Sequence, residues 1–448
     1  MREKRTVQSS IFEAYAEHDI GQELAAMSDW LFCHPELLDP VMADIGNRGA
    51  GAGGRKGLPV ESVLRCAILK QYRQLSYEEL VFCLMDSASC QAFARLPMGW
   101  FPQKTTLQQT ISAISEATWE HINQALLHSA KVAKVEKGEV VRIDSTVTDT
   151  PIHEPSDSTL LWDSVRTLVR LLRQAEEMLE GGKLNYCNHS RRAKRRMWAI
   201  HNGRGQAKRA QLYRDLVKVT RKSLAYTEAA NKTLMRSTVG SLAYLGWWGE
   251  FCHYQPLILK IIDQTERRVL KGEKVPAKEK IFSLFEEHTD IIVKGGRKIQ
   301  YGHKLNLSTG KSALVLDVVI EAGNPADSER FVPMLERHIA HYGKVPRQIA
   351  ADGGYASLEN LQEAKLWKVE DVVFHKKRGL KVEDMAKSPW VYRKLRNFRA
   401  GIEAGISCLK RAYALGRCTW KGLEHFKAYV WSSVVAHNLA LFGRLQME

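Results

Sequence analysis

The chain has 448 residues, of which 44% are hydrophobic and 26% are charged. This composition excludes disordered and fibrous proteins, and the length predicts two or three units with their own cores. The most apolar run, "AYVWSSVVAHNLALF", is too short and too polar to span a bilayer, and the N-terminus lacks the apolar core of a secretion signal. We therefore expect a cytoplasmic protein without a membrane partner.

The charge is strongly basic. Sixty-six Lys and Arg residues oppose 50 Asp and Glu residues, for a formal net charge of +16. Such a balance predicts a polyanionic partner, although charge alone leaves DNA, RNA and an anionic membrane surface open. The eight cysteines show no metal-ligand spacing, so we expect reduced, packed thiols and neither zinc nor disulfides.

The N-terminal part of the chain shows helical periodicity. Residues 8–46 predict helices, and the glycine-rich stretch "GNRGAGAGGRKGLP" that follows predicts a flexible, basic linker. Further short helices up to about residue 137 fit either a helix-turn-helix unit or a plain helical bundle. Two capping boxes are predicted, Ser76 with Glu79 and Thr105 with Gln108.

Strand signals begin at "EVVRIDSTV" and then give way to helical periodicity up to about residue 287. They resume with "RKIQYGHKLNLSTGKSALVLDVVIEAG", which predicts an antiparallel hairpin. The later strands "PRQIAA" and "DVVF" alternate with helices. This order predicts an α/β mixed sheet flanked by helices, with an all-α insertion after the first strand.

Two aspartates lie in or directly after apolar strands. An unpaired carboxylate at Asp144, in a strand buried on both faces, would cost several kcal/mol, so a cation must lie nearby. Asp352 ends a second apolar strand, and we expect Gly353 and Gly354 after it to let a ligand approach. Either aspartate alone could be a turn or helix-capping residue.

A third acid, Glu403, lies on a predicted helix. At about 100° per residue, Arg399, Glu403 and Lys410 fall within roughly 40° on one face. A solvated pair between Arg399 and Glu403 is the simpler interpretation. Gly401 and Gly405 each weaken the helix by about 1 kcal/mol relative to alanine, and they favour a close approach beside Glu403 instead. The adjoining apolar stripe is Leu395, Phe398, Ile402, Ile406, Leu409 and Tyr413.

Two aspartates and a glutamate form a hard oxygen-ligand set suited to Mg²⁺ or Mn²⁺. Three adjacent carboxylates repel one another unless cations neutralise them. Two ions about 3.5–4 Å apart could activate a water or a 3′-hydroxyl and stabilise the leaving oxygen of a phosphodiester. Arg399 and Lys410 would then hold phosphates beside the metals.

Two basic segments predict further nucleic-acid contacts. Residues 191–223 hold twelve Lys and Arg residues and one acid. They are either a solvated face or a helix that follows DNA phosphates, with Trp198 and Tyr213 available for stacking. The candidate contacts there are Arg191, Arg192, Lys194, Arg195 and Arg196. The loop after "DVVF" is equally an ordinary surface or a second DNA surface, with His375, Lys376, Lys377 and Arg378.

The motifs "IDSTVTDT" and "ADGGYAS" and the glutamate helix resemble the DDE motif of bacterial insertion-sequence transposases, whose catalytic domain has a ribonuclease-H-like fold. In that family the helix follows the pattern Y-(2)-R-(3)-E-(6)-K. Arg399, Glu403 and Lys410 match its last three positions, and Arg396 stands where the family has tyrosine. "YGHKLNLSTG" and "GNPADS" are similar to the family's second strand and to the turn before its fourth.

The resemblance implies a function. The protein would bind the terminal inverted repeats of a mobile element, cut to free 3′-hydroxyls and join them to target DNA. Asp144, Asp352 and Glu403 would hold two Mg²⁺ or Mn²⁺ ions, and Arg396, Arg399 and Lys410 would contact DNA. Such enzymes act on double-stranded DNA as homodimers or larger assemblies, here in association with a bacterial nucleoid.

Composition and the order of elements predict three domains, and the resemblance touches all of them except about residues 155–290. Residues 1–137 would be a helical DNA-binding or dimerisation domain, residues 138–154 and 291–448 the catalytic domain, and residues 155–290 a basic helical insertion. Two other functions stay open. One is a nuclease that cuts without joining, and the other is a DNA-binding regulator or an inactive descendant of a transposase.

Overall fold

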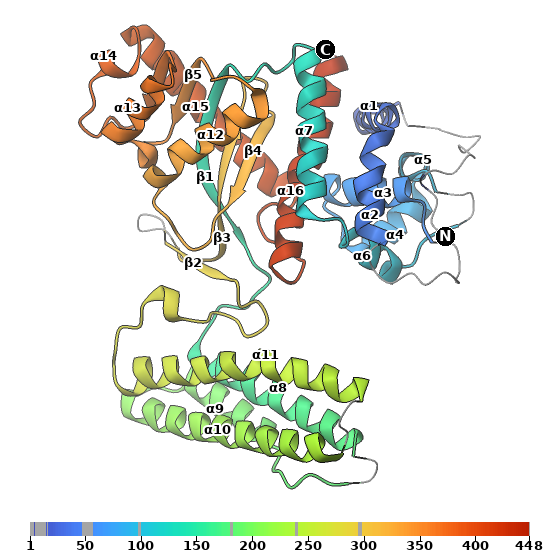
Figure 1. Ribbon diagram of the computed structural model, residues 1–448, viewed down its shortest axis with the longest axis vertical. Helices are drawn as coiled ribbons and strands as arrows, with labels where there is room; N and C mark the ends of the chain where they lie inside the picture. The colour runs from blue at the N-terminus through green and yellow to red at the C-terminus, as the bar shows by residue number, and fades with distance from the viewer. Residues whose placement is uncertain are drawn as a thin grey trace. The chain divides into compact units, whose positions relative to one another are not determined.

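The computed structural model describes residues 4, 15, 17–46, 57–96, 100–179, 182–237, 241–293 and 298–447. They form two compact units (Figure 1). Unit 1 comprises Met1–Pro151 and Gly302–Glu448, and unit 2 comprises Ile152–Tyr301. Most of the predicted glycine-rich linker lies outside the described residues. No described helix combines the length and the hydropathy needed to cross a membrane.

The sheet of unit 1 is mixed, as predicted. Five of the six strands are hydrogen-bonded neighbours in the order β4-β3-β1-β5-β6, and the short strand β2 (Asp290–Ile292) also pairs with β3. Strand β3 pairs antiparallel with β1 and β4, whereas β5 pairs parallel with β1 and β6. The predicted hairpin is therefore confirmed as β3 and β4. The strand bounds are β1 (Val140–Asp149), β3 (Gln300–Thr309), β4 (Val315–Ile320), β5 (Gln348–Ala351) and β6 (Asp371–Phe374).

Helices flank this sheet. Helix α15 packs on β1, β5 and β6, and α12 packs on β4 (Figure 1). Both faces of β3 are consequently buried, including the polar residues His303, Lys304 and Asn306. The helices that follow the hairpin are α12 (Phe331–Tyr342), α13 (Leu358–Leu366), α14 (Val382–Met385), α15 (Pro389–Ala412) and α16 (Leu423–Met447).

The N-terminal helices also belong to unit 1. They are α1 (Asp19–Cys33), α2 (Leu38–Gly46), α3 (Val60–Tyr72), α4 (Tyr77–Asp86), α5 (Ala88–Ala94), α6 (Lys104–Ile111) and α7 (Glu116–Val132). Helices α1, α3 and α7 pack against α16, which holds the apolar run noted in the sequence. One hydrophobic core joins these helices to the sheet. The division into functional domains stays a prediction.

The two predicted capping boxes had different outcomes. Ser76 and Glu79 form the predicted box at the start of α4. The box of Thr105 with Gln108 is wrong, because α6 begins at Lys104 with Gln103 at its cap, and Thr105 lies inside the first turn. A capping box needs its first residue in extended backbone, and a residue inside the helix cannot fill that position.

Unit 2 packs four helices around a separate core. They are α8 (Asp157–Glu177), α9 (Ser190–Asn202), α10 (Gln206–Ser237) and α11 (Leu242–Thr265), followed by a π-helical turn (Glu266–Leu270). The expectation of helix up to residue 287 is wrong, since residues 271–289 contain only a short 3-10 turn (Ala277–Glu279) before strand β2 (Asp290–Ile292). Gly272 and Pro276 occur directly after the helical part, and neither residue supports a helix interior.

Candidate active site

Two of the three predicted acids are brought together by the register of the sheet. Strands β1 and β5 run parallel, and Ile143 pairs with Ala351. Asp144 and Asp352 each follow one residue later, so they lie at the same level on neighbouring strands. Asp352 caps a short 3-10 turn but forms no capping hydrogen bond with its side chain among the described residues. The sequence interpretation of Asp352 as a capping side chain is therefore not supported.

One guanidinium gathers all three acids. Arg399 Nη2 lies 2.7 Å from Asp144 Oδ2 and 3.2 Å from Asp352 Oδ1, and Arg399 Nη1 lies 2.7 Å from Glu403 Oε1. The cation expected beside Asp144 is thus Arg399, whose side chain is only 8% exposed. The simple Arg399–Glu403 pair also exists, but it is one part of a larger cluster.

The site opens gradually toward solvent. The Asp144 side chain is 12% exposed, that of Asp352 is 37% exposed and that of Glu403 is 64% exposed. Asp144 is further oriented by the Ser145 backbone N–H, which donates to its Oδ1 at 2.7 Å. A substrate would therefore approach from the side of Glu403, with Asp144 at the inner end.

The three acids offer oxygen ligands, but they are not among the described groups whose ligand atoms all lie within 4.8 Å of one another. One guanidinium cannot neutralise three carboxylates, so a negative charge remains in a partly buried place. Carboxylate oxygens are the ligands that Mg²⁺ and Mn²⁺ prefer, and added positive charge would relieve the repulsion among them. The three acids surround the Arg399 guanidinium, and a metal would share these oxygens with it.

Gly401 makes room for the chain's own arginine. A side chain at Gly401 would overlap Arg142 Nη1. Arg142 is buried in β1, where it donates to Thr309 Oγ1 at 2.7 Å and to the Phe398 carbonyl at 2.9 Å. The close approach expected beside Glu403 therefore exists at Gly401, but its occupant is Arg142 and not a ligand. Gly405 faces open space.

The two glycines after Asp352 also leave room for side chains of the protein itself. A Cβ on Gly353 would lie 2.6 Å from Lys376 Cβ, and one on Gly354 would lie 2.6 Å from Asp327 Oδ2. We expected a ligand to lie close to this turn, but two charged side chains of the protein occupy that space. Both come from loops that end beside the sheet, and both line the neighbourhood of Asp352.

A buried polar cluster next to Asp144 was missed by the sequence analysis. Ser145 Oγ donates to Asp327 Oδ1 at 3.0 Å, and Lys304 Nζ lies 2.5 Å from the same oxygen. Tyr355 is fully buried, and this burial together with Asp327 and Asp144 raises its pKa well above the usual value. The motif "GNPADS" contains Asp327, but nothing in the local pattern indicated its partners.

The remaining motif residues of α15 lie in different surroundings. Arg396 is exposed. Lys410 is half-buried, and burial lowers its pKa although Asp149 acts in the opposite direction. Lys410 follows Glu403 by seven residues, which corresponds to roughly 10 Å along the helix axis. Of the two predicted phosphate ligands, only Arg399 therefore contacts the acids.

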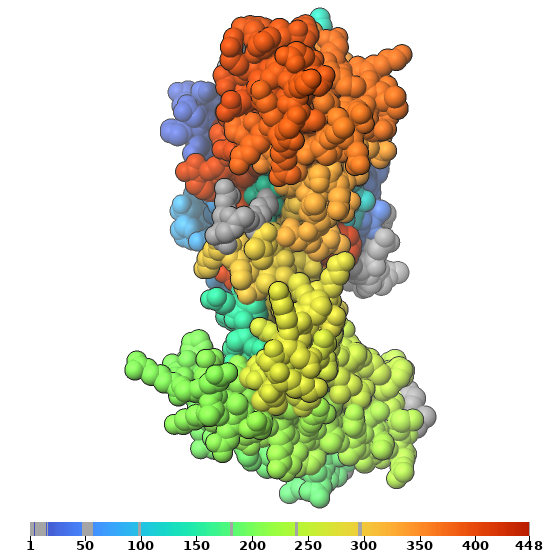
Figure 2. All heavy atoms as spheres, turned by 90° about the vertical axis from the view of Figure 1, so that its left-hand side faces the viewer, coloured from blue at the N-terminus to red at the C-terminus, as the bar shows by residue number. Residues whose placement is uncertain are grey.

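The basic loop after β6 begins beside the site. Lys376 packs against Gly353, and the Lys377 ammonium lies 5.5 Å from the centre of the Tyr392 ring. Figure 2 shows the C-terminal part of the chain, in orange to red, as one surface region at the top of the view. Lys376, Lys377 and Arg378 are all exposed. Their position beside Asp352 agrees with the expectation of a charged surface near the active site, and contact with DNA stays a prediction.

The basic segment of unit 2 is partly neutralised within the protein. Arg192 and Arg196 both bind the acid of this segment, Asp215, with Arg196 Nε 2.6 Å from its Oδ2. Tyr213 is buried in the core of unit 2, so its expected role in stacking is wrong. Trp198 is 52% exposed and keeps that possibility. The exposed cations of α9 that form no ion pair with a described residue are Arg191, Lys194 and Arg195.

Another group of potential metal ligands lies elsewhere in unit 1. Glu120, Asp317 and His341 place ligand atoms within 4.8 Å of one another. Arg337, however, donates to Asp317 at 2.6 Å and to Glu120 at 2.9 Å. Arg337 brings one positive charge to this group, as Arg399 does to the other three acids, so the group is a salt-bridge cluster that also has the ligand spacing of a metal site.

The fold and the site together define an α/β protein that gathers three carboxylates from two parallel strands and a helix packed across them. Residues 259–439 match the family described as the transposase DDE domain. This match spans less than half of the chain, and it covers Asp352 and Glu403 but not Asp144. No curated protein and no solved structure matched the chain.

Proposed function

We propose that the protein is an insertion-sequence transposase that binds terminal inverted repeats, cuts DNA at the element ends and joins the 3′-hydroxyl ends to target DNA. The observation that carries this proposal is the convergence of Asp144, Asp352 and Glu403 on Arg399. The strand order β4-β3-β1-β5-β6, with its first three strands antiparallel and the last two parallel, agrees with a ribonuclease-H-like catalytic domain.

The three carboxylates would hold two Mg²⁺ or Mn²⁺ ions. When bound, such ions activate a water or a 3′-hydroxyl as nucleophile and stabilise the leaving oxygen of the phosphodiester. Asp144 is held in place by β1 and by the Ser145 N–H. Arg399 keeps the acids close together in the absence of DNA, and its planar fork also suits a phosphate.

DNA would contact three basic surfaces. The first is the exposed loop with Lys376, Lys377 and Arg378, the second is α15 with Arg396 and Lys410, and the third is α9 in unit 2. Exposed cations of this density bind phosphates without regard to sequence and make affinity fall with salt. We further propose that the active form is a homodimer or a larger assembly on DNA, acting in the cytoplasm.

The central experiment uses duplex DNA that carries the flanking element ends, with Mg²⁺ or Mn²⁺. We expect cleavage at the ends, and we expect pre-cleaved ends to be inserted into a plasmid. Cutting without insertion would favour a nuclease, and DNA binding without cutting would favour a regulator. Mapping the cut strand and its position identifies the reaction directly.

Neutralising either aspartate tests the site. Asp144→Asn and Asp352→Asn should each lower the rate of cutting and joining on the order of 10³-fold, because an amide is a poor ligand and leaves the site undercharged. DNA affinity, measured by fluorescence anisotropy, should change less than about twofold. Glu139→Gln is the matched control, since Glu139 is an exposed carboxylate directly before β1. Wild-type activity in either asparagine variant would overturn the assignment.

A further inference from the structure

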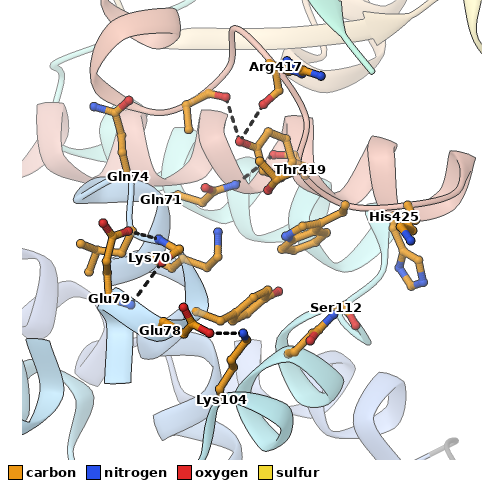
Figure 3. Close-up of a pocket in the computed structure, with 18 of the residues that line it drawn as sticks. Lys70, Gln71, Gln74, Glu78, Glu79, Lys104, Ser112, Arg417, Thr419 and His425 are labelled. Carbon is orange, nitrogen blue, oxygen red and sulfur yellow. Dashed lines mark hydrogen bonds and ion pairs between the residues drawn. The ribbon is translucent and has the colours of Figure 1, made fainter. Parts of the chain in front are cut away.

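Unit 1 contains a cleft of about 1050 Å³ that none of the sequence motifs predicted (Figure 3). One wall is formed by the end of α3 and the start of α4. The opposite wall is formed by the end of α15, the segment that follows it and the start of α16. The family match covers only the second wall, because it begins at residue 259.

Lys70 reaches into this cleft from α3, as Figure 3 shows. It is only 4% exposed, and it forms no ion pair with any residue in the described part of the chain. Its ammonium lies 5.0 Å from the centre of the Tyr77 ring, and burial lowers its pKa to about 8. A ring face offsets only a small part of the cost of burying an ammonium. Within the described parts of the chain, no carboxylate therefore lies within ion-pair distance of this ammonium, although the charge of Glu79 acts on it.

Two further hydrogen-bond donors in the cleft are unused. Trp420 Nε1 and Tyr77 Oη are buried, and neither has a hydrogen-bond partner among the described residues. An indole N–H can only donate, so Trp420 requires an acceptor. Buried polar groups without a partner are rare in folded proteins, and each one calls for an explanation. Lys70, Tyr77 and Trp420 thus line one space, and the ammonium and the two neutral donors are groups whose chemistry suits an anion.

The rim of the cleft is also positive. It carries two glutamates and four cations, Lys104, Lys410, Arg417 and Lys421. Glu78 is paired with Lys104, and Glu79 accepts the Ser76 N–H in the capping box. Both acids are thus engaged. The excess of positive charge at the rim would attract a polyanion and would repel cationic ligands.

We propose that this cleft binds a phosphate group of the DNA backbone, with Lys70 as the buried counter-charge and Trp420 and Tyr77 as neutral donors. This assignment deepens the proposed function and rests on it. Lys410 at the rim lies on the same helix as Glu403, roughly 10 Å away along its axis, so DNA held in the cleft would be close to the acids. Phosphate contacts of this kind position a duplex without reading its sequence.

Hydrogen bonds join the N-terminal wall of the cleft to the end of α15 and to α16. Gln74 Nε2 donates to the Arg411 carbonyl at 2.6 Å, and Gln71 Nε2 donates to Ser432 Oγ at 2.8 Å. These bonds hold the two walls of the cleft at a defined separation. A phosphate in the cleft would be bound jointly by residues from both ends of the chain.

The test uses the full chain and two probes. Inorganic phosphate is titrated by calorimetry at constant ionic strength against chloride, and a double-stranded oligonucleotide is titrated by fluorescence anisotropy over a series of salt concentrations. Lys70→Met removes the charge and keeps the apolar stem, whereas Trp420→Phe and Tyr77→Phe remove one donor each and keep a ring. The control is Lys131→Met, because Lys131 also lies over a tyrosine ring, that of Tyr342, but outside the cleft.

We expect Lys70→Met to weaken binding of both probes at least tenfold and to reduce the salt dependence of DNA binding by about one phosphate contact. The two phenylalanine variants should weaken the binding of both probes severalfold, and Lys131→Met should bind both with wild-type affinity. If Lys70→Met fails to fold, as judged by circular dichroism, the phenylalanine variants decide.

Other outcomes would overturn the proposal. Loss of inorganic phosphate binding with unchanged DNA affinity and salt dependence would mean that the cleft takes free phosphate and not DNA. Wild-type binding of both probes in all three cleft variants would exclude an anion site. A protein that cuts no DNA with Mg²⁺ but loses DNA binding in Lys70→Met would support the cleft and refute the transposase.

Discussion

The acidic site of unit 1 and the basic helices of unit 2 are built on opposite principles. The acids lie far apart in the sequence and meet through the register of β1 with β5 and the packing of α15. The cations of residues 191–223 are neighbours in the sequence and lie along the surfaces of two helices. A metal site requires several side chains to meet at one point, whereas phosphate binding requires only many cations on one surface. One substitution should therefore disable the first region, but only several together should weaken the second.

The largest effect is expected from Arg399→Gln, which tests whether Asp144, Asp352 and Glu403 depend on one shared cation. It removes the only cation within 4 Å of all three acids among the described residues, so we expect the free energy of unfolding to fall by about 3–5 kcal/mol, as for a broken buried ion pair. Mn²⁺ should then raise the melting temperature more in the variant than in the wild type, because the metal relieves an unscreened repulsion. If Mn²⁺ raised the melting temperature of Asp352→Asn as much as that of the wild type, the ion would bind elsewhere.

The test of density is the triple variant Arg191→Gln, Lys194→Gln and Arg195→Gln. We expect DNA affinity at low salt to fall roughly ten- to hundredfold and the salt slope to decrease by about two to three contacts, while cutting of saturating DNA changes little. Arg170→Gln is the control, since its guanidinium is held by Glu250 at 2.8 and 2.9 Å. An unchanged slope would show that α9 is an ordinary solvated surface.

The smallest expected effect distinguishes two glycines of one helix. Gly401→Ala should lower the free energy of unfolding by about 1–3 kcal/mol, because its methyl group displaces the hydrogen-bonded Arg142 guanidinium. Gly405→Ala should raise it by up to about 1 kcal/mol, since the site is open and alanine favours the helix. Urea unfolding measures both. If the two variants had the same free energy of unfolding, the Arg142 guanidinium would move aside without loss of stability.

Much of this arrangement could be predicted because its signals are local. A carboxylate inside an apolar strand, at Asp144, required a cation, and Arg399 is that cation. The antiparallel hairpin and the apolar stripe of α15 followed from residue periodicity. The helical prediction up to residue 287 failed because a 3.6-residue pattern continued past the end of the actual helices. The prediction that Tyr213 stacks on bases failed because aromatic residues suit a buried core as well as a stacking surface.

The order of the main strands, the three candidate acids and the excess of cations could be read from the sequence alone, because burial, periodicity and charge are properties of short segments. Only the tertiary structure decided that Arg142, Lys376 and Asp327 occupy the space left by three glycines, and that Lys70 and Trp420 face one cleft. Those contacts join residues that are tens to hundreds of positions apart. Their energies depend on the distance between side chains, which no local pattern specifies.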